Sequence, residues 1–356
     1  MKRFLILLMI LVFVGPALAF KVGPTGVVNG IPYLIYNSTY GAYYGVIGKG
    51  KNFFNQDESL TLSAYLISNG GNGAYFVFSL PDSADRHDKM LGLTFDLTGA
   101  IGKTVQERYY GLGNSTPATG YTTMDNVHNK LDFQFSRAIS PVTQLAADFF
   151  VANNNYTNIS QGANALTPQI TNLASNYLGV SFKLTLDKRD QVLDPHQGIY
   201  CSTNIDFGLT NAQYVKAGFD FRSYHTPIAA DQVLATRFML EQAGGDKIPI
   251  YEYPFLGGKD TMRGYTVNRW RDKGLGLVNL EYRLPTPVPF LKGLSTVFFF
   301  EAGKVGPNLS SLGFDNWATD AGLGLHLNLG GNVIVRGDFG HGTEGTNAYF
   351  FYNQAF

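Results

Sequence analysis

One arginine and two glutamates near the C-terminal end of the sequence could form a buried ion-pair cluster. Arg263 lies in a glycine-rich stretch with the sequence PFLGGKDTMRGY. Glu281 lies in residues 279–283 (NLEYR), and Glu301 lies in residues 298–303 (FFFEAG). A guanidinium group keeps its charge at any ordinary pH, and its planar fork of donors matches a carboxylate. These residue types therefore point to a structural clasp between a loop and two strands.

The clasp requires strands that turn both acids to the same side. Each glutamate alternates with apolar residues, so the acids face away from the apolar side of their strands. In a membrane barrel a cation on the lipid face near the midplane would cost about 2–4 kcal/mol, so we expect the arginine inside with the acids. Gly264 lets the backbone turn tightly beside Arg263.

Period-two alternation of apolar and polar residues is the dominant pattern of the whole chain, as in residues 93–98, 131–136 and 323–329. It predicts strands with one lipid-compatible face and one polar face. The sequence therefore predicts an all-β fold, a transmembrane antiparallel β-barrel of about 16 strands. The expected strands span residues 31–37, 40–50, 59–69, 74–81, 90–101, 127–139, 142–155, 175–187, 197–209, 212–225, 232–244, 275–285, 294–304, 319–329, 332–341 and 347–356.

The connections between these strands alternate in length. Those at residues 81–89, 140–141, 188–196, 286–293 and 330–331 are fairly short, whereas the polar segments 102–126, 156–174, 245–274 and 305–318 are longer. Outer-membrane barrels have short periplasmic turns and longer external loops. A soluble β-sandwich is the alternative, but it would not need outward aromatic residues on nearly every strand.

The start of the chain has the pattern of a cleaved signal peptide. Lys2 and Arg3 precede an apolar run over residues 4–14, and Ala17-Leu18-Ala19 is a small-x-small cleavage site. We therefore expect a signal peptide over residues 1–19, a short periplasmic segment over 20–30 and the barrel over 31–356. This organisation predicts location in the bacterial outer membrane.

Composition excludes several other functions. The formal net charge is zero, which gives no support for a nucleic-acid partner. A single cysteine, Cys201, allows no internal disulfide and no thiol-based metal site. Asp187, Asp190 and Asp194 lack the spacing of a known calcium loop, and Lys188 and Arg189 neutralise them. No local motif groups a nucleophile with a base, so we predict no enzyme activity, no metal and no bound cofactor.

Several of these motifs together resemble those of the bacterial surface antigen superfamily of outer-membrane barrels, which includes the BamA and TamA assembly factors. The motifs are residues 256–258 (LGG), 262–265 (MRGY), 279–283 (NLEYR), 299–303 (FFEAG) and the final Phe356. The family more often has aspartate where this chain has Glu301. The resemblance implies a lumen loop motif of Gly257, Gly258, Arg263, Gly264 and Tyr265, with Glu281 and Glu301 as its carboxylate partners. It also implies a C-terminal assembly signal containing Tyr352 and Phe356.

The resemblance also carries an expectation about function. Family members that assemble or translocate proteins usually carry periplasmic polypeptide-transport-associated domains, and only residues 20–30 precede the first expected strand here. The chain is thus similar to a barrel-only member that aids protein insertion or translocation through a seam between its first and last strands. The alternative is a passive small-solute channel or surface antigen. The expected partners are outer-membrane lipid, the barrel assembly machinery for its own insertion, and either client proteins or a separate periplasmic-domain protein.

Overall fold

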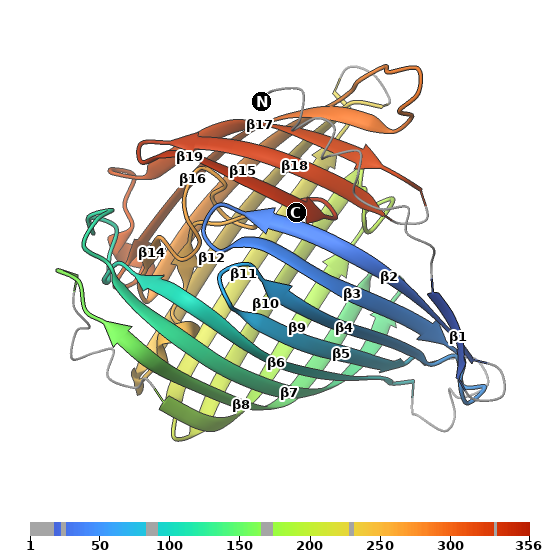
Figure 1. The fold of residues 1–356 in the computed structure, drawn as a ribbon, viewed down its shortest axis with the longest axis horizontal. Helices are drawn as coiled ribbons and strands as arrows, with labels where there is room; N and C mark the ends of the chain where they lie inside the picture. Colours follow the sequence, from blue (N-terminus) through green and yellow to red (C-terminus); the bar gives the residue numbers. More distant parts are fainter. Residues whose placement is uncertain (1–17, 23–25, 83–91, 165–173, 228–230, 331–332) are drawn as a thin grey trace.

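A computed structural model describes residues 18–22, 26–82, 92–164, 174–227, 231–330 and 333–356. Residues 1–17, which hold most of the expected signal peptide, lie outside the described residues. The described chain is almost entirely β-strand (Figure 1). The strands are β1 (Leu18–Val22), β2 (Gly26–Asn37), β3 (Gly41–Lys51), β4 (Ser59–Ile67), β5 (Asn72–Leu80), β6 (Thr94–Tyr109), β7 (Thr122–Ser140), β8 (Thr143–Ser160), β9 (Ala174–Asp187), β10 (Gly198–Thr210), β11 (Gln213–His225), β12 (Val233–Lys247), β13 (Phe255–Leu256), β14 (Trp270–Arg271), β15 (Gly274–Pro285), β16 (Leu294–Gly306), β17 (Ala318–Asn328), β18 (Ile334–Gly342) and β19 (Gly345–Tyr352). Two single-turn 3₁₀ helices are η2 (Ile250–Glu252) and η3 (Leu309–Ser311).

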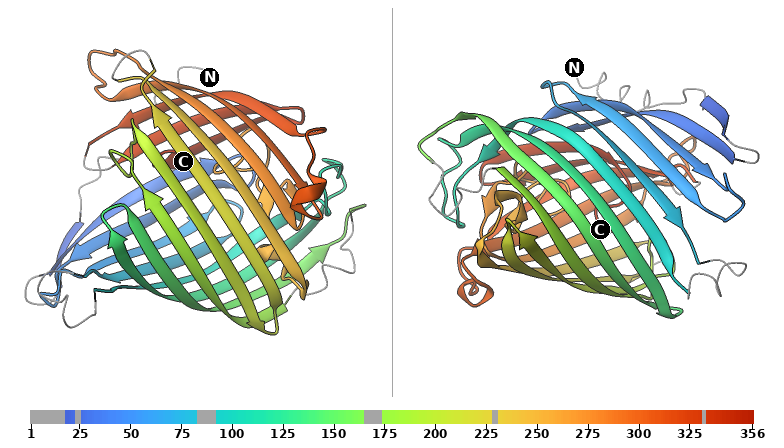
Figure 2. Two further views of the ribbon diagram at one scale, coloured as in Figure 1. Left: turned by 180° about the vertical axis from the view of Figure 1, so that it is seen from behind. Right: turned by 90° about the horizontal axis from the view of Figure 1, so that it is seen from below.

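Sixteen of these strands close into one antiparallel barrel, which confirms the predicted fold. From β2 to β12, consecutive strands pair with each other, and β12 then pairs with β15. Consecutive pairing continues from β15 to β19, and β19 pairs with β2 to close the ring. The short strand β1 lies outside the ring and pairs with the first residues of β2, from Gly26 to Gly30. The hairpin of β13 and β14 belongs to the connection between β12 and β15, which lies inside the barrel wall (Figures 1 and 2).

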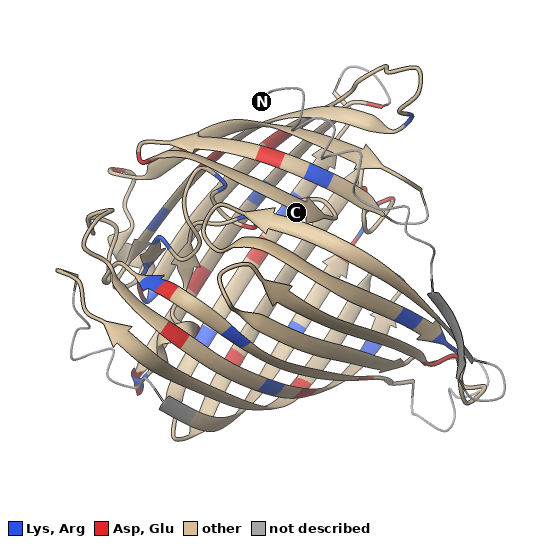
Figure 3. Ribbon diagram, in the orientation of Figure 1, with Lys and Arg blue, Asp and Glu red and all other residues tan. Residues whose placement is uncertain are grey.

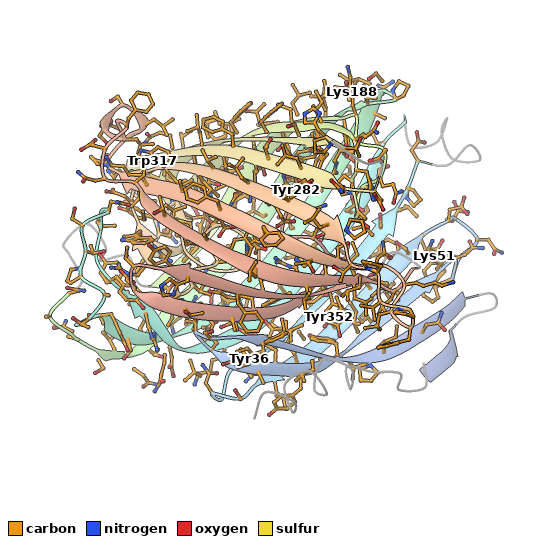
Figure 4. The ribbon with its side chains drawn as sticks, turned by 90° about the horizontal axis from the view of Figure 1, so that it is seen from above. Tyr36, Lys51, Lys188, Tyr282, Trp317 and Tyr352 are labelled. Atoms are coloured by element: carbon orange, nitrogen blue, oxygen red, sulfur yellow. The ribbon has the colours of Figure 1, made fainter. Side chains whose placement is uncertain are left out.

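The longest connection of the barrel, between β12 and β15, lies at the same end as the connection from β16 to β17. Figure 4 places Lys51 and Lys188 toward one end and Trp317 at the other. Lys51 closes β3 and Lys188 follows β9, whereas Trp317 lies in the connection from β16 to β17. From the loop lengths we call the first end periplasmic and the second extracellular.

The outer face of the wall carries the apolar side chains. Large residues such as Leu62, Phe149, Phe182 and Leu323 are about half exposed on it. Such an apolar exterior is what a barrel presents to lipid. In the part of the chain that the structure describes, no helix has the length and apolar character needed to cross a membrane.

Strands β6, β7 and β8 extend further toward the extracellular end than predicted. They contain 16, 19 and 18 residues, and β7 begins at Thr122 rather than at residue 127. Beyond the predicted bounds the ladder continues through pairs such as Asn126 with Tyr156 and Asp125 with Thr157, where apolar and polar residues no longer alternate. The prediction was too short because the hydrophobic alternation ends there, while the backbone ladder continues.

The seam between the first and last strands of the ring has few paired positions. β19 pairs with β2 at two positions, Tyr349 with Asn37 and Phe350 with Tyr36. By comparison, β18 and β19 pair at eight positions, and β2 and β3 at eleven. Beyond Asn37, the backbone N–H of Ser38 donates to the carbonyl of Ala348 at 3.1 Å.

The last strand is also shorter than the predicted strand over residues 347–356. β19 ends at Tyr352, and the chain then leaves the wall. Phe356 is only 6% exposed and packs against Tyr224, Val233 and Ala235. Gln354 explains the early ending, because its polar amide finds hydrogen-bond partners in the lumen and would find none in lipid.

Candidate functional site

The connection between β12 and β15, residues 248–273, folds back into the lumen and is called the lumen loop here. Its first part packs on the wall through aromatic contacts, with Ile248 and Tyr253 against Phe150, Tyr177 and Tyr214. The hydroxyl of Tyr177 also donates to Glu252 at 2.6 Å. This part of the loop is therefore held against the wall before the chain reaches the glycine-rich stretch.

Lys216 balances the charge of Glu252 in this first part of the loop. Its ammonium group donates to the Glu252 carboxylate. Burial by itself would raise the pKa of Glu252, but the charge and hydrogen bond of Lys216 lower it overall. Glu252 therefore stays ionised and holds η2 to β11.

Arg263 is fully buried at the centre of the loop and contacts three carboxylates. Its Nη1 lies 2.9 Å from Oε2 of Glu281 and 3.2 Å from Oδ2 of Asp338. Its Nε lies 2.9 Å from Oε1 of Glu301, and the backbone N–H of Arg263 donates to Oε2 of the same carboxylate. Burial would lower the pKa of Arg263, but the three acids raise it well above its ordinary value. The two glutamates singled out in the sequence thus lie on the arginine, together with an aspartate that sequence reasoning missed.

A second layer of basic side chains surrounds these acids. Arg283 donates to Glu281 at 2.7 Å, Arg336 donates to Asp338 at 2.6 Å, and the Nε2 of His326 lies 2.9 Å from Asp338. Three arginines therefore face three acids in a space that excludes water. Arg336 and Asp338 occupy alternate positions of a strand whose other residues fit a membrane-spanning strand. Charged residues in such a strand indicate a polar interior site, so this pattern could have predicted both.

Backbone carbonyls at the tip of the loop are held from three strands. Arg336 donates to the carbonyl of Lys259 at 3.2 Å, Arg237 to that of Asp260 at 2.8 Å, and Asn279 to that of Thr261 at 2.6 Å. Since three consecutive carbonyls are satisfied in this way, the loop has one defined position.

The glycines of the motif allow this close packing. Gly257 and Gly258 have φ angles of +103° and +107°, in the region that favours glycine. A side chain at Gly257 would meet the carbonyl oxygen of Thr266 at 2.1 Å. The backbone N–H of Gly264 donates to Asp320 at 2.9 Å, and Asp320 is a second acid that the sequence did not single out.

Tyr265 connects the loop to the strands beside the seam. Its hydroxyl donates to the carbonyl of Thr319 at 2.8 Å, and its own carbonyl accepts from the hydroxyl of Tyr349 on β19 at 2.7 Å. Two residues later, the backbone N–H of Val267 donates to Oγ1 of Thr39, just after β2, at 3.0 Å. The loop therefore bridges both sides of the seam.

In the acidic turn of residues 187–194, the central carboxylate binds the turn's own backbone. Asp190 accepts backbone N–H groups from Gln191, His196 and Gln197. Its pKa is lowered because these bonds outweigh the opposing effect of burial. Among the described residues, no group of three or more His, Cys, Asp or Glu side chains could hold a metal ion.

Replacing Gly340 of β18 by alanine should displace the lumen loop. The new Cβ would lie 2.5 Å from the backbone carbon of Arg263 and from the nitrogen of Gly264, and neither backbone atom can yield without moving the clasp. We expect a clear loss of folded barrel, measured by heat-modifiable mobility on a gel. Gly244→Ala is the matched control, since its Cβ would meet nothing within 4 Å. Equal folded yields for the two variants would contradict this packing.

Comparisons with known proteins agree with this architecture. Residues 52–341 match the Omp85 superfamily domain. Among solved structures, BamA from Haemophilus ducreyi lacking POTRA domains 1–3 aligns with a TM-score of 0.67 at 15% identity, over 92% of this chain and 70% of that one. CdiB from Acinetobacter baumannii aligns with a TM-score of 0.63 at 13% identity, over 92% of this chain and 59% of that one. CdiB from Escherichia coli aligns with a TM-score of 0.63 at 12% identity, over 96% of this chain and 68% of that one.

These structures share the fold of this chain. Their sequence identities are too low to show a shared function. No curated protein sequence matches the chain at a significant level.

Proposed function

Because this chain belongs to the Omp85 superfamily of outer-membrane barrels, we propose that it aids the insertion or translocation of proteins at the bacterial outer membrane. The route is the seam between β2 and β19. The observation that carries the proposal is the pairing of these strands at two positions only. Such a role needs no catalytic residue and no cofactor, in keeping with a family of barrels that are not enzymes.

The edge of β2 supports this route. The ladder between β2 and β19 stops at Tyr36, and Pro32, nearer the start of β2, has no backbone N–H to donate. A strand edge with free backbone groups is a template for an extended segment of another chain. A client strand could therefore add to β2 between Ile31 and Ile35, where neither β1 nor β19 pairs with it.

The wall beside the seam also differs from the rest of the barrel. Strands β2, β4, β5 and β19 contain no charged residue, whereas charges recur along the strands from β6 to β18 (Figure 3). Apolar and aromatic side chains such as Ile31, Tyr33 and Tyr65 take the place of charges on the inner face. An apolar strand of a client could pass along this wall without stripping water from buried ions.

A passive small-solute channel is the second candidate. What favours it is a polar cavity of about 330 Å³ in the lumen, lined by residues that include Lys183, Asp220, Arg222 and Glu241. The lumen loop weighs against it, because it packs on β8, β9 and β11 on one side and reaches the seam on the other.

Insertion activity can be tested directly in liposomes. We expect vesicles containing the purified protein to fold a urea-denatured small outer-membrane barrel at least several-fold faster than empty vesicles. The readout is the rate at which the client acquires heat-modifiable mobility. Vesicles with a porin at the same protein-to-lipid ratio control for defects around any inserted barrel. Equal rates with the porin would rule out the insertion role, and solute efflux without client folding would favour the channel.

A further inference from the structure

Residues 353–356, which follow β19, fold inward and fill a pocket at the periplasmic end of the lumen. These residues are called the tail here. The backbone N–H of Asn353 still donates to the carbonyl of Ile334 at 2.8 Å. From Gln354 on, the contacts are with side chains such as His326 of β17 and Asp194 of the turn between β9 and β10. The tail is thus bound as a ligand would be, and not as a strand.

The apolar part of the pocket holds the ring of Phe356. Tyr224 of β11 and Val233 and Ala235 of β12 surround the ring, and all three side chains are almost fully buried. Arg283 closes this part of the pocket, with its Nη2 3.5 Å from the backbone oxygen of Phe356. Burying an aromatic side chain in this way contributes about 1.5–3 kcal/mol to binding.

In the polar part of the pocket, both the oxygen and the nitrogen of the Gln354 amide have hydrogen-bond partners. Its Oε1 lies 2.7 Å from Nδ1 of His326, and its Nε2 donates to Oδ1 of Asp194 at 2.8 Å. Asp194 also accepts a hydrogen bond from Asn328 at 2.8 Å. An amide carries an acceptor and a donor on two separate atoms, so it can bridge the imidazole and the aspartate.

Both parts of the pocket are connected to the Arg263 clasp. Arg283, beside Phe356, donates to Glu281, and Glu281 contacts Arg263. His326, beside Gln354, contacts Asp338, which also contacts Arg263. Two separate chains of hydrogen bonds therefore run from the tail to the lumen loop.

We propose that this pocket is a peptide-binding site that the tail occupies in cis, and that its occupancy sets the tightness of the Arg263 clasp. The fitting ligand is an extended peptide with a glutamine two residues before an aromatic residue. If the protein inserts clients as proposed above, such a segment of a client displaces the tail. Release of the tail frees the end of β19 and removes Arg283 and His326 from their fixed positions, so the loop loosens as the seam strand is freed.

Peptide binding to the folded barrel in detergent tests the site without any client or membrane. The probe is a fluorescently labelled peptide with the sequence of residues 352–356, YNQAF, and the readout is anisotropy. A tethered segment competes at an effective concentration on the order of mM. We therefore expect Phe356→Ala barrel to bind the probe at least tenfold more tightly than wild type. Gln354→Ala should act in the same direction and serves as the second variant if Phe356→Ala does not fold.

Two controls define the pocket. Phe290→Ala removes an aromatic side chain that is 80% exposed on a periplasmic turn, and it should bind the probe as wild type does. The peptide YNQAA should bind the Phe356→Ala barrel at least tenfold more weakly than YNQAF. Equal affinity of all barrels for YNQAF, or equal affinity for both peptides, would overturn the site, whatever the liposome assay shows.

The coupling to the loop has its own readout in Trp270. This residue is 5% exposed and contacts Tyr265 edge to face, with ring centroids 4.5 Å apart. In a Trp317→Phe background it is the single tryptophan, since the chain has two. We expect its emission to lie at longer wavelength in the Phe356→Ala barrel than with Phe356 in place, and unlabelled YNQAF at saturation to shift the emission of the Phe356→Ala barrel back to shorter wavelength. Saturation with no change in emission would overturn the coupling.

Discussion

Arg263→Ala should greatly reduce the yield of folded barrel while export continues. The substitution leaves Glu281, Glu301 and Asp338 in a buried space without the cation that joins them. Removing one partner of a buried ion pair typically costs about 3–5 kcal/mol. That is a large part of the stability of most proteins, which is about 5–15 kcal/mol. Heat-modifiable mobility and protease resistance of the isolated membranes measure the effect.

Two further substitutions separate charge from geometry. Arg263→Lys keeps the charge but cannot reach several acids with a planar fork, so its folded yield should lie between wild type and alanine. Arg137→Ala removes an exposed arginine of β7 and should fold like wild type. If Arg263→Ala matched wild type in folded yield, gel shift and protease resistance, the cluster would not be needed to fold the barrel.

A disulfide across the seam should abolish client insertion without unfolding the barrel. The observed register, Asn37 with Tyr349 and Tyr36 with Phe350, places Leu34 opposite Tyr352 when it is continued. Facing positions of adjacent antiparallel strands lie within the range of Cα separations that a disulfide accepts. In a Cys201→Ser background, the oxidised Leu34→Cys, Tyr352→Cys variant should insert client at least tenfold more slowly than its reduced form.

The matched control uses the same cysteine on the other side of β2. Leu34 pairs with Tyr44 of β3, so the Leu34→Cys, Tyr44→Cys variant forms a cross-strand disulfide that leaves the seam free. Oxidation of this variant should not change client insertion. An equal rate for the oxidised and reduced seam variant would show that insertion does not need the seam to open.

The parts of the site that could be predicted from the sequence are those fixed by local alternation. Glu281 and Glu301 stand out because each is a lone acid among apolar neighbours in a strand. Arg263 stands out because a glycine-rich loop in a barrel has only the lumen in which to bury a cation. The fold followed from the same period-two pattern, repeated along the chain.

Other parts depend on register between distant strands, and local patterns do not contain it. Asp338 reaches Arg263 because β17 lies between β16 and β18 with a particular stagger. The bridge from Val267 to Thr39 exists because the ring closes. The inward path of residues 353–356 depends on a pocket made by β11, β12 and β15, so the final residues read as a continued strand.

The position of the clasp partners along the chain has a consequence for the order of assembly. All three acids that hold Arg263 follow it in the sequence, on β15, β16 and β18. The C-terminal third can therefore organise around its own loop while the earlier strands are still an open sheet. Thr39 and the residues near Thr116, which contact the loop from the first half, can attach only when the ring shuts. Closure is thus the last step, and its template is the C-terminal third of the chain, which is synthesised last.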